Sequence, residues 1–292
     1  MEYDVHLDCV TMLRKLLVGM LSLLVSTHYI YMTSWSKFPP ETREVQLDEK
    51  WAFVYKKQKN CANDEKYEGD NWDHVAYDPE HKLVIEVVPG KRNSENTDKV
   101  VSQMKKRTGG KMLDLIASDE YRPYKTAILN HYGKEVKPQR NGKSGRLPKP
   151  IKVPSDGLNY VVVHKTREKG KVIKIEPRII FGCEEDIASI LKKSSVSRAI
   201  NTSFIERYNG TDRHQNSTKA RNTYEFSKKW DYHNLKTYFV AYSYNFCWPV
   251  RTLRKKVSEK KYLQQTPAMA AKLTDHVWEL REWLEMSFVQ RG

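Results

Sequence analysis

The chain has 292 residues, which is enough for one large domain with appended segments or for two modest domains. Hydrophobic residues make up 39% of it and aromatic residues 11%, which excludes a disordered polymer. There are 51 basic and 36 acidic residues, giving a formal net charge of +15. This surplus favours a polyanionic partner such as nucleic acid, because each neutralised phosphate releases counterions. A basic protein with no nucleic-acid role is the alternative.

The compartment is predicted from the cysteines and from one apolar run. The four cysteines lack CxxC spacing and are typical of reduced thiols in a cytoplasmic protein. The run from Leu16 to Met32 follows Arg14 and Lys15, but it is short and contains serine, threonine and histidine. It therefore predicts a buried or partner-seeking helix, with a membrane anchor as the weakest alternative, and we expect no membrane partner.

The first part of the folded region is predicted to be a series of strands and helices. Residues 45–55 alternate between apolar and polar, which places Asp48 on the more polar face of a strand. Residues 72–77 and 83–88 predict a hairpin that turns at an Asp-Pro pair.

A helix at 95–107, a short apolar strand at 113–117 and a helix at 124–132 are predicted to follow. Asp119 comes just past the end of the short strand. The order β, β, β, α, β, α is that of an α/β fold with a ribonuclease H-like core, a mixed five-stranded sheet with helices.

The rest of the chain predicts an insertion and a helical region. Residues 134–157 are rich in glycine, proline and lysine, and short strands at 160–163 and 172–175 predict an inserted β-hairpin. Helices are expected to begin at Thr202 or Ser203, near residue 227 and at Thr266. The predicted domains are an N-terminal helical segment at 1–44, a core at 45–230 with an insertion at about 134–182, and a C-terminal helical region at 231–292.

Three acidic residues stand where a ribonuclease H-like core gathers carboxylates. Asp48 lies in the middle of the first strand, Asp119 at the end of the fourth, and Glu206 on a late helix. Mg²⁺ prefers carboxylate oxygens, and two divalent ions can activate the attacking oxygen and stabilise the leaving oxygen in phosphoryl transfer. We therefore predict that these three residues bind two Mg²⁺ or Mn²⁺ ions and are catalytic.

Each of these carboxylates also has a structural interpretation. Asp48 could be a solvated strand residue, Asp119 could cap the helix that follows, and Glu206 completes a Ser-x-x-Glu capping box. Other acidic residues lie nearby and could be mistaken for the site: Glu49, Asp73, Asp78, Asp114 and Glu120.

Basic and polar residues near these carboxylates and farther along predict DNA contacts. Asn209 and Arg213 follow Glu206 at spacings of three and seven, which places them on one helical face. A later basic run beside Tyr262, which includes Arg251 and Arg254, suits contacts to backbone phosphates. In both places a solvated charged face is the alternative.

Five stretches of the chain resemble the DDE transposases of the insertion-sequence-one family, within the ribonuclease H-like and retroviral-integrase superfamily. They cover about residues 45 to 285, and five blocks in order are specific although each alone is weak. In chain order the stretches are Gln46–Lys59, Ala117–Tyr124, Asn201–Asn209, Tyr244–Cys247 and Thr266–Trp278.

The resemblance implies a site and an activity. The family's metal-binding triad is the Asp after Gln-Leu, the Asp that begins Asp-x-Tyr and the Glu before Arg-x-Asn, which match Asp48, Asp119 and Glu206. The basic residue expected to meet transposon-end DNA matches Arg213. The family implies metal-dependent hydrolysis at the ends of the element, then attack of the freed 3′ hydroxyl on target DNA. It also implies a homo-oligomer on DNA, in the cytoplasm of a bacterium or archaeon and associated with the nucleoid.

Two departures from the family weaken this interpretation. Family members usually begin with a zinc-binding segment and a helix-turn-helix that reads the terminal repeats, but residues 1–44 are too few for both and hold no cysteine pair. A truncated, frameshifted or mis-started chain would explain this and puts sequence-specific end binding in question. Val250 stands where relatives tend to carry histidine. The alternatives are therefore a degenerate, non-catalytic DNA-binding remnant and a structure-selective nuclease on the same core.

Overall fold

The computed structural model describes Gly19 and residues 40–62, 67–138 and 149–282. The helix predicted from Leu16 to Met32 and most of the predicted N-terminal segment fall outside these residues. The chain divides into two compact units. The sheet unit comprises Glu41–Lys50 and Asp73–Asn209, and the helical unit includes Trp51–Trp72 and the chain from Gly210 onward.

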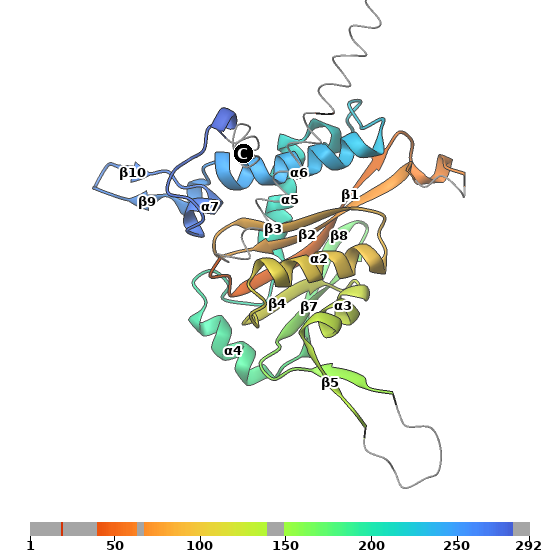
Figure 1. The fold of residues 1–292 in the computed structure, drawn as a ribbon, viewed down its shortest axis with the longest axis vertical. Helices are drawn as coiled ribbons and strands as arrows, with labels where there is room; N and C mark the ends of the chain where they lie inside the picture. The colour runs from red at the N-terminus through yellow and green to blue at the C-terminus, as the bar shows by residue number, and fades with distance from the viewer. Residues whose placement is uncertain (1–18, 20–39, 63–66, 139–148, 283–292) are drawn as a thin grey trace, which may run out of the picture. The chain divides into compact units, whose positions relative to one another are not determined.

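A six-stranded mixed sheet forms the framework, in the order β3-β2-β1-β4-β7-β8 (Figure 1). β4 pairs in parallel with both β1 and β7, and β8 pairs antiparallel with β7. This arrangement confirms the predicted α/β, ribonuclease H-like fold. The strands are β1 (Glu44–Val54), β2 (Gly69–Asp78), β3 (Leu83–Gly90), β4 (Leu115–Asp119), β7 (Tyr160–Glu168) and β8 (Lys171–Phe181).

Helices cover the sheet because alternate strand residues are apolar on both faces. Ile116 belongs to the main core with helices α2 (Ser94–Arg107) and α3 (Pro123–Tyr132), which lie side by side along the sheet (Figure 1). Leu115 and Ala117 belong instead to a second apolar cluster with Ile187 of α4 (Glu184–Lys193). The strand β4 is therefore buried on both sides, which fixes the position of its last residue.

The predicted hairpin at residues 160–175 forms as β7 and β8 but does not lie outside the sheet. β7 is the fifth strand of the core, and β8 extends the sheet to six strands instead of the expected five. The sequence signal for this placement was the run of four apolar residues Tyr160–Val163, which the structure buries. Such a run is typical of a strand covered on both faces. An inserted hairpin does exist earlier, where β5 (Gly133–Val136) pairs antiparallel with β6 (Ile151–Pro154).

A buried ion pair attaches α2 to the sheet. Arg107 Nε lies 2.8 Å from Glu86 Oε2 of β3, and both side chains are almost fully buried. Burial raises the pKa of Glu86, and the charge of Arg107 opposes this rise. Removing one partner of such a pair leaves an uncompensated charge in the core, whereas replacing both with apolar side chains does not.

We expect Arg107→Met to lower the free energy of unfolding by about 3–5 kcal/mol. The matched double variant Glu86→Met/Arg107→Met is expected to recover most of this loss. Urea denaturation of the three proteins measures both effects. Equal losses in the single and double variants would show that the side chains act by packing and not by charge.

The helical unit is built around α6 (Trp230–Cys247), which packs against the one-turn helix α7 (Pro267–Ala270). The end of α6 is held by Phe246, whose ring centroid lies 4.6 Å from that of Trp278. Most aromatic residues in the second half of α6 are buried, as expected for a core helix. Among the described residues, no helix has both the length and the apolar character needed to cross a membrane.

Candidate metal centre

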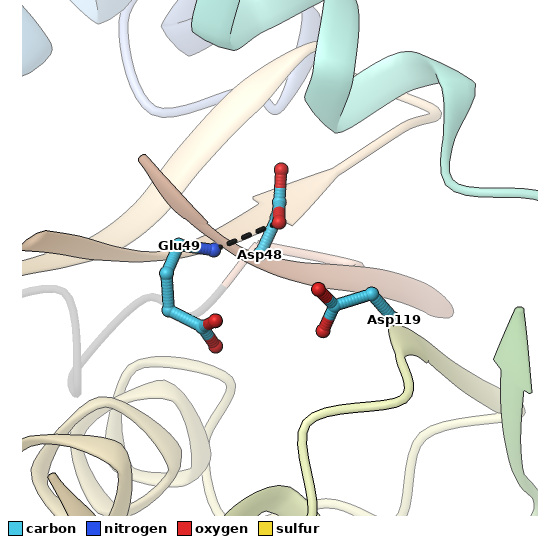
Figure 2. Close-up of side chains that lie close together, drawn as sticks. All are labelled: Asp48, Glu49 and Asp119. Carbon is cyan, nitrogen blue, oxygen red and sulfur yellow. Dashed lines mark hydrogen bonds between the residues drawn. The ribbon is translucent and has the colours of Figure 1, made fainter. Parts of the chain in front are cut away.

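Asp48 and Asp119 lie side by side on neighbouring parallel strands. Leu47 of β1 is paired in register with Ser118 of β4, so the two aspartates are the next residues along each strand. Equivalent positions in parallel strands point to the same face, about 4.8 Å apart. Figure 2 shows the Asp119 carboxylate directed toward β1. The sequence predicts that Asp48 lies within one strand and that Asp119 follows another, and a ribonuclease H-like order makes these two strands neighbours.

Glu49 joins the two aspartates, although its position in the sequence indicates only a nearby acidic residue. One carboxylate oxygen of each of Asp48, Glu49 and Asp119 lies within 4.8 Å of the others. Glu49 leaves β1 in a different direction from Asp48, as neighbouring strand residues do (Figure 2). Its length allows it to reach the cluster.

Arg92 holds the Glu49 carboxylate. Its Nη2 lies 2.9 Å and its Nε 3.2 Å from Glu49 Oε2, and its guanidinium carbon lies 4.0 Å from the centre of the Tyr121 ring. The Glu49 side chain is only 1% exposed, so a positive partner compensates a buried charge. Because Arg92 and Glu49 are far apart in the chain, the sequence offers no pattern from which this contact could be predicted.

Asn209 fixes the orientation of Asp48. Its Nδ2 donates to Asp48 Oδ2 at 2.7 Å, and the backbone N–H of Glu49 donates to Asp48 Oδ1 at 2.9 Å. Asn209 was predicted to contact DNA, but it is 4% exposed and contacts the carboxylate cluster itself. A contact between this residue and DNA stays a prediction.

Glu206 lies on helix α5 (Ser203–Gln215) and is not one of the three clustered carboxylates. Its Oε1 forms an ion pair with Lys165 of β7 and accepts a hydrogen bond from Thr202 Oγ1 at 2.8 Å. Lys165 Nζ also donates to Thr202 Oγ1 at 3.0 Å. Thr202, and not Ser203, therefore contacts this glutamate at the start of the helix.

The carboxylates raise one another's pKa values. Burial, with the charges of Asp119 and Glu49, raises the pKa of Asp48 to about 7. Burial and the charge of Asp119 raise the pKa of Glu49 to about 7, and burial also raises the pKa of Asp119. The charge of Glu206 adds to the rise at both aspartates, so Glu206 is electrostatically coupled to the cluster.

The cluster suits a hard divalent cation. Glu49 Oε1 and Asp119 Oδ1 are buried and accept no hydrogen bond from the part of the chain that the structure describes. Buried carboxylate oxygens normally have donors, so unmatched oxygens that converge with other anions are suited to binding a positive ion. Carboxylate oxygens are the ligands of Mg²⁺ and Mn²⁺. Asp48, Glu49 and Asp119 could hold a metal ion.

The predicted DNA-contacting arginines lie in the helical unit. Arg213 is half-buried on α5, while Arg251 and Arg254 are exposed at the short 3₁₀ helix η4 (Arg251–Leu253) and just after it. Their predicted contacts with DNA stay predictions.

Comparisons with known proteins give little further information. No family model matches the chain, and no curated protein matches it. Among solved structures, one similar chain is the Mos1 transposase in a paired-end complex with the left transposon end. The two are 15% identical, the match covers 38% of this chain and 39% of that one, and the TM-score is 0.20.

Proposed function

We propose that the protein is a DNA transposase that uses divalent metal ions to cut and join phosphodiester bonds. The observation that carries the proposal is the cluster of Asp48, Glu49 and Asp119 on the paired strands β1 and β4. Two of its oxygens, Glu49 Oε1 and Asp119 Oδ1, are buried without hydrogen-bond donors among the described residues. The five sequence blocks that resemble insertion-sequence-one transposases support DNA as the substrate. The net charge of +15 suits the same polyanion.

The residues of the cluster would have distinct roles. Asp48, Asp119 and Glu206 would be the protein ligands of two divalent ions, either Mg²⁺ or Mn²⁺. The chemistry supplied by such ions is activation of the attacking oxygen and stabilisation of the leaving oxygen. Asn209 would keep the Asp48 carboxylate turned toward the site, because it already donates to one oxygen of Asp48.

The identity of the third carboxylate is open to a direct test. Glu206 matches the family pattern but is paired with Lys165, whereas Glu49 lies in the cluster but is paired with Arg92. The exposed Arg92 guanidinium holds the buried Glu49 carboxylate in place, which fits a positioning role for Glu49. Glu206 is 48% exposed, so it has the freedom to exchange the Lys165 ammonium for a metal ion.

The proposal is tested by measuring nicking and strand joining on DNA that carries the flanking element's ends. The reactions are run in Mg²⁺ or Mn²⁺ and, for comparison, in EDTA. Glu206→Gln is expected to reduce both by about 100-fold or more, because a metal ligand is lost. Glu49→Gln is expected to have a smaller effect, and Glu120→Gln is the control because Glu120 is exposed and paired with His164 and Arg178.

Each outcome separates the alternatives. A larger loss in Glu49→Gln than in Glu206→Gln would make Glu49 the third ligand. Cleavage without joining would indicate a structure-selective nuclease. DNA binding that falls with salt, without metal-dependent cleavage by the wild type, would overturn the proposal in favour of a non-catalytic remnant.

A further inference from the structure

A strongly basic hairpin projects from the helical unit. It consists of η4, β9 (Lys255–Lys256) and β10 (Tyr262–Leu263), and we call residues 251–264 the basic hairpin. Figure 1 shows β9 and β10 extending away from α6 and α7. Its charged side chains, all exposed, are Arg251, Arg254, Lys255, Lys256, Lys260, Lys261 and the single acidic residue Glu259.

The hairpin has an ordered backbone in spite of its exposure. Lys256 pairs with Tyr262 and Lys255 pairs with Leu263 in an antiparallel ladder. The turn is closed by a hydrogen bond of 2.9 Å from Val257 N to Lys261 O. An isolated two-stranded hairpin is only marginally stable in water, so contacts with a polyanionic partner would add to its stability.

Its side chains separate onto two faces, because paired residues lie on the same side of a ladder and neighbours alternate. Lys256 and Tyr262 share one face with Arg254, whose guanidinium carbon lies 4.2 Å from the centre of the Tyr262 ring. This stacking orients the planar guanidinium, so less conformational entropy is lost when it binds an anion. Lys255 and Leu263 share the opposite face.

The spacing and shape of this ribbon fit a DNA duplex. Arg254 and Lys256 are two residues apart, which corresponds to about 6.6 Å along an extended chain, so the two cations can reach different phosphates of one DNA strand. The major groove of DNA is wide enough to admit a two-stranded ribbon. Cations on both faces could then contact the phosphates on either side of the groove.

We propose that the basic hairpin binds the phosphate backbone of duplex DNA without reading its sequence. The inference rests on the proposed function, because it assigns to the hairpin part of the affinity for the same DNA. The hairpin contributes salt-dependent affinity and no base specificity, since lysine and arginine contacts to phosphates carry no sequence information.

The test is a fourfold variant in which Lys255, Lys256, Lys260 and Lys261 are all changed to Gln. Binding to a fluorescent duplex of about 30 base pairs is followed by anisotropy at several NaCl concentrations. Each lost phosphate contact removes about 0.9 from the slope of log affinity against log salt, so the slope should fall by about 3 to 4. The loss should be equal for two unrelated sequences. The variant should keep its thermal midpoint, because all four side chains are exposed.

A matched control removes the same charge elsewhere: Lys125, Lys171, Lys192 and Lys193, all exposed in the sheet unit, are changed to Gln. Its salt slope is expected to stay near that of the wild type. Equal slopes for the wild type and the hairpin variant, with wild-type binding and cleavage intact, would overturn the inference alone. A wild type that fails to bind DNA would overturn the proposed function as well. Binding of the wild type to anionic vesicles but not to duplex DNA would assign the hairpin to a membrane surface.

Discussion

Asp119→Asn is expected to lower metal-dependent DNA cleavage by about a thousandfold or more, which corresponds to about 4 kcal/mol of transition-state stabilisation. Asp119 lies at the end of β4 with its carboxylate directed toward β1, and its Oδ1 is buried without a hydrogen-bond donor among the described residues. Asparagine has nearly the same shape but lacks the negative charge that a hard cation requires. Single-turnover nicking with saturating enzyme measures the effect.

The control for this variant is Asp114→Asn, because Asp114 is exposed just before the same strand. DNA affinity should be unchanged or slightly higher in Asp119→Asn, since a negative charge is removed from a site that receives phosphate. Cleavage that survives in Asp119→Asn while Asp114→Asn behaves like the wild type would remove Asp119 from the reaction. Loss of affinity together with cleavage would point instead to a damaged fold.

The central pair of the site was predictable because it depends on local periodicity. Alternation along residues 45–55 placed Asp48 in the middle of a strand, and a short apolar run placed Asp119 at the end of another. In a ribonuclease H-like order these two strands are neighbours, and the structure pairs them in parallel. Once the strands pair, their side-chain positions follow from the two-residue repeat of a strand.

The surroundings of the pair were not predictable because they depend on contacts between distant segments. Alternation places Glu49 on the face opposite Asp48, and only its length and the Arg92 contact bring it to the cluster. The ion pair of Glu206 with Lys165 joins residues 41 positions apart, and no spacing rule relates them. The Asn209–Asp48 hydrogen bond spans 161 positions. The sequence spacing predicts which face of the helix carries Asn209, but it does not predict which residues that face contacts.

For β7 the sequence pattern predicts the strand and its hairpin partner correctly, but it does not predict that β7 pairs with β4. Residues 160–163 were assigned to a strand, and residues 172–175 to its hairpin partner, and both form. A hairpin defines its own two strands but not the sheet edge to which they add. Here that edge is β4, because the run Tyr160–Val163 needs apolar cover on both faces and α3 and α4 supply it. Lys165 reaches Glu206 only because β7 is in the core.

Asp48→Asn is expected to stabilise the protein in the absence of metal while abolishing cleavage. The pKa of Asp48 is about 7 in the folded protein against 3.8 for the free side chain, so the folded state binds more protons between these values. The free energy of unfolding of the wild type should therefore fall as pH rises from about 4 to 7, and then level off. Glu49, whose pKa is also raised to about 7, adds to the same fall. At pH 8 the substitution should recover roughly 2–4 kcal/mol of this loss, and at pH 5 much less.

Urea denaturation in EDTA at pH 5 and pH 8 measures the difference, and Asp78→Asn is the control. Asp78 is also buried, but its carboxylate accepts hydrogen bonds from Thr42 Oγ1 and from the backbone N–H groups of Glu80 and His81. Its substitution should destabilise the protein at both pH values, because satisfied donors lose an acceptor.

Adding Mg²⁺ should stabilise the wild type at pH 8 and leave Asp48→Asn nearly unchanged, because bound metal offsets the repulsion that the substitution removes. An Asp48→Asn variant that is less stable than the wild type at pH 8 in EDTA would mean that the carboxylate is held for structure and not for a cation.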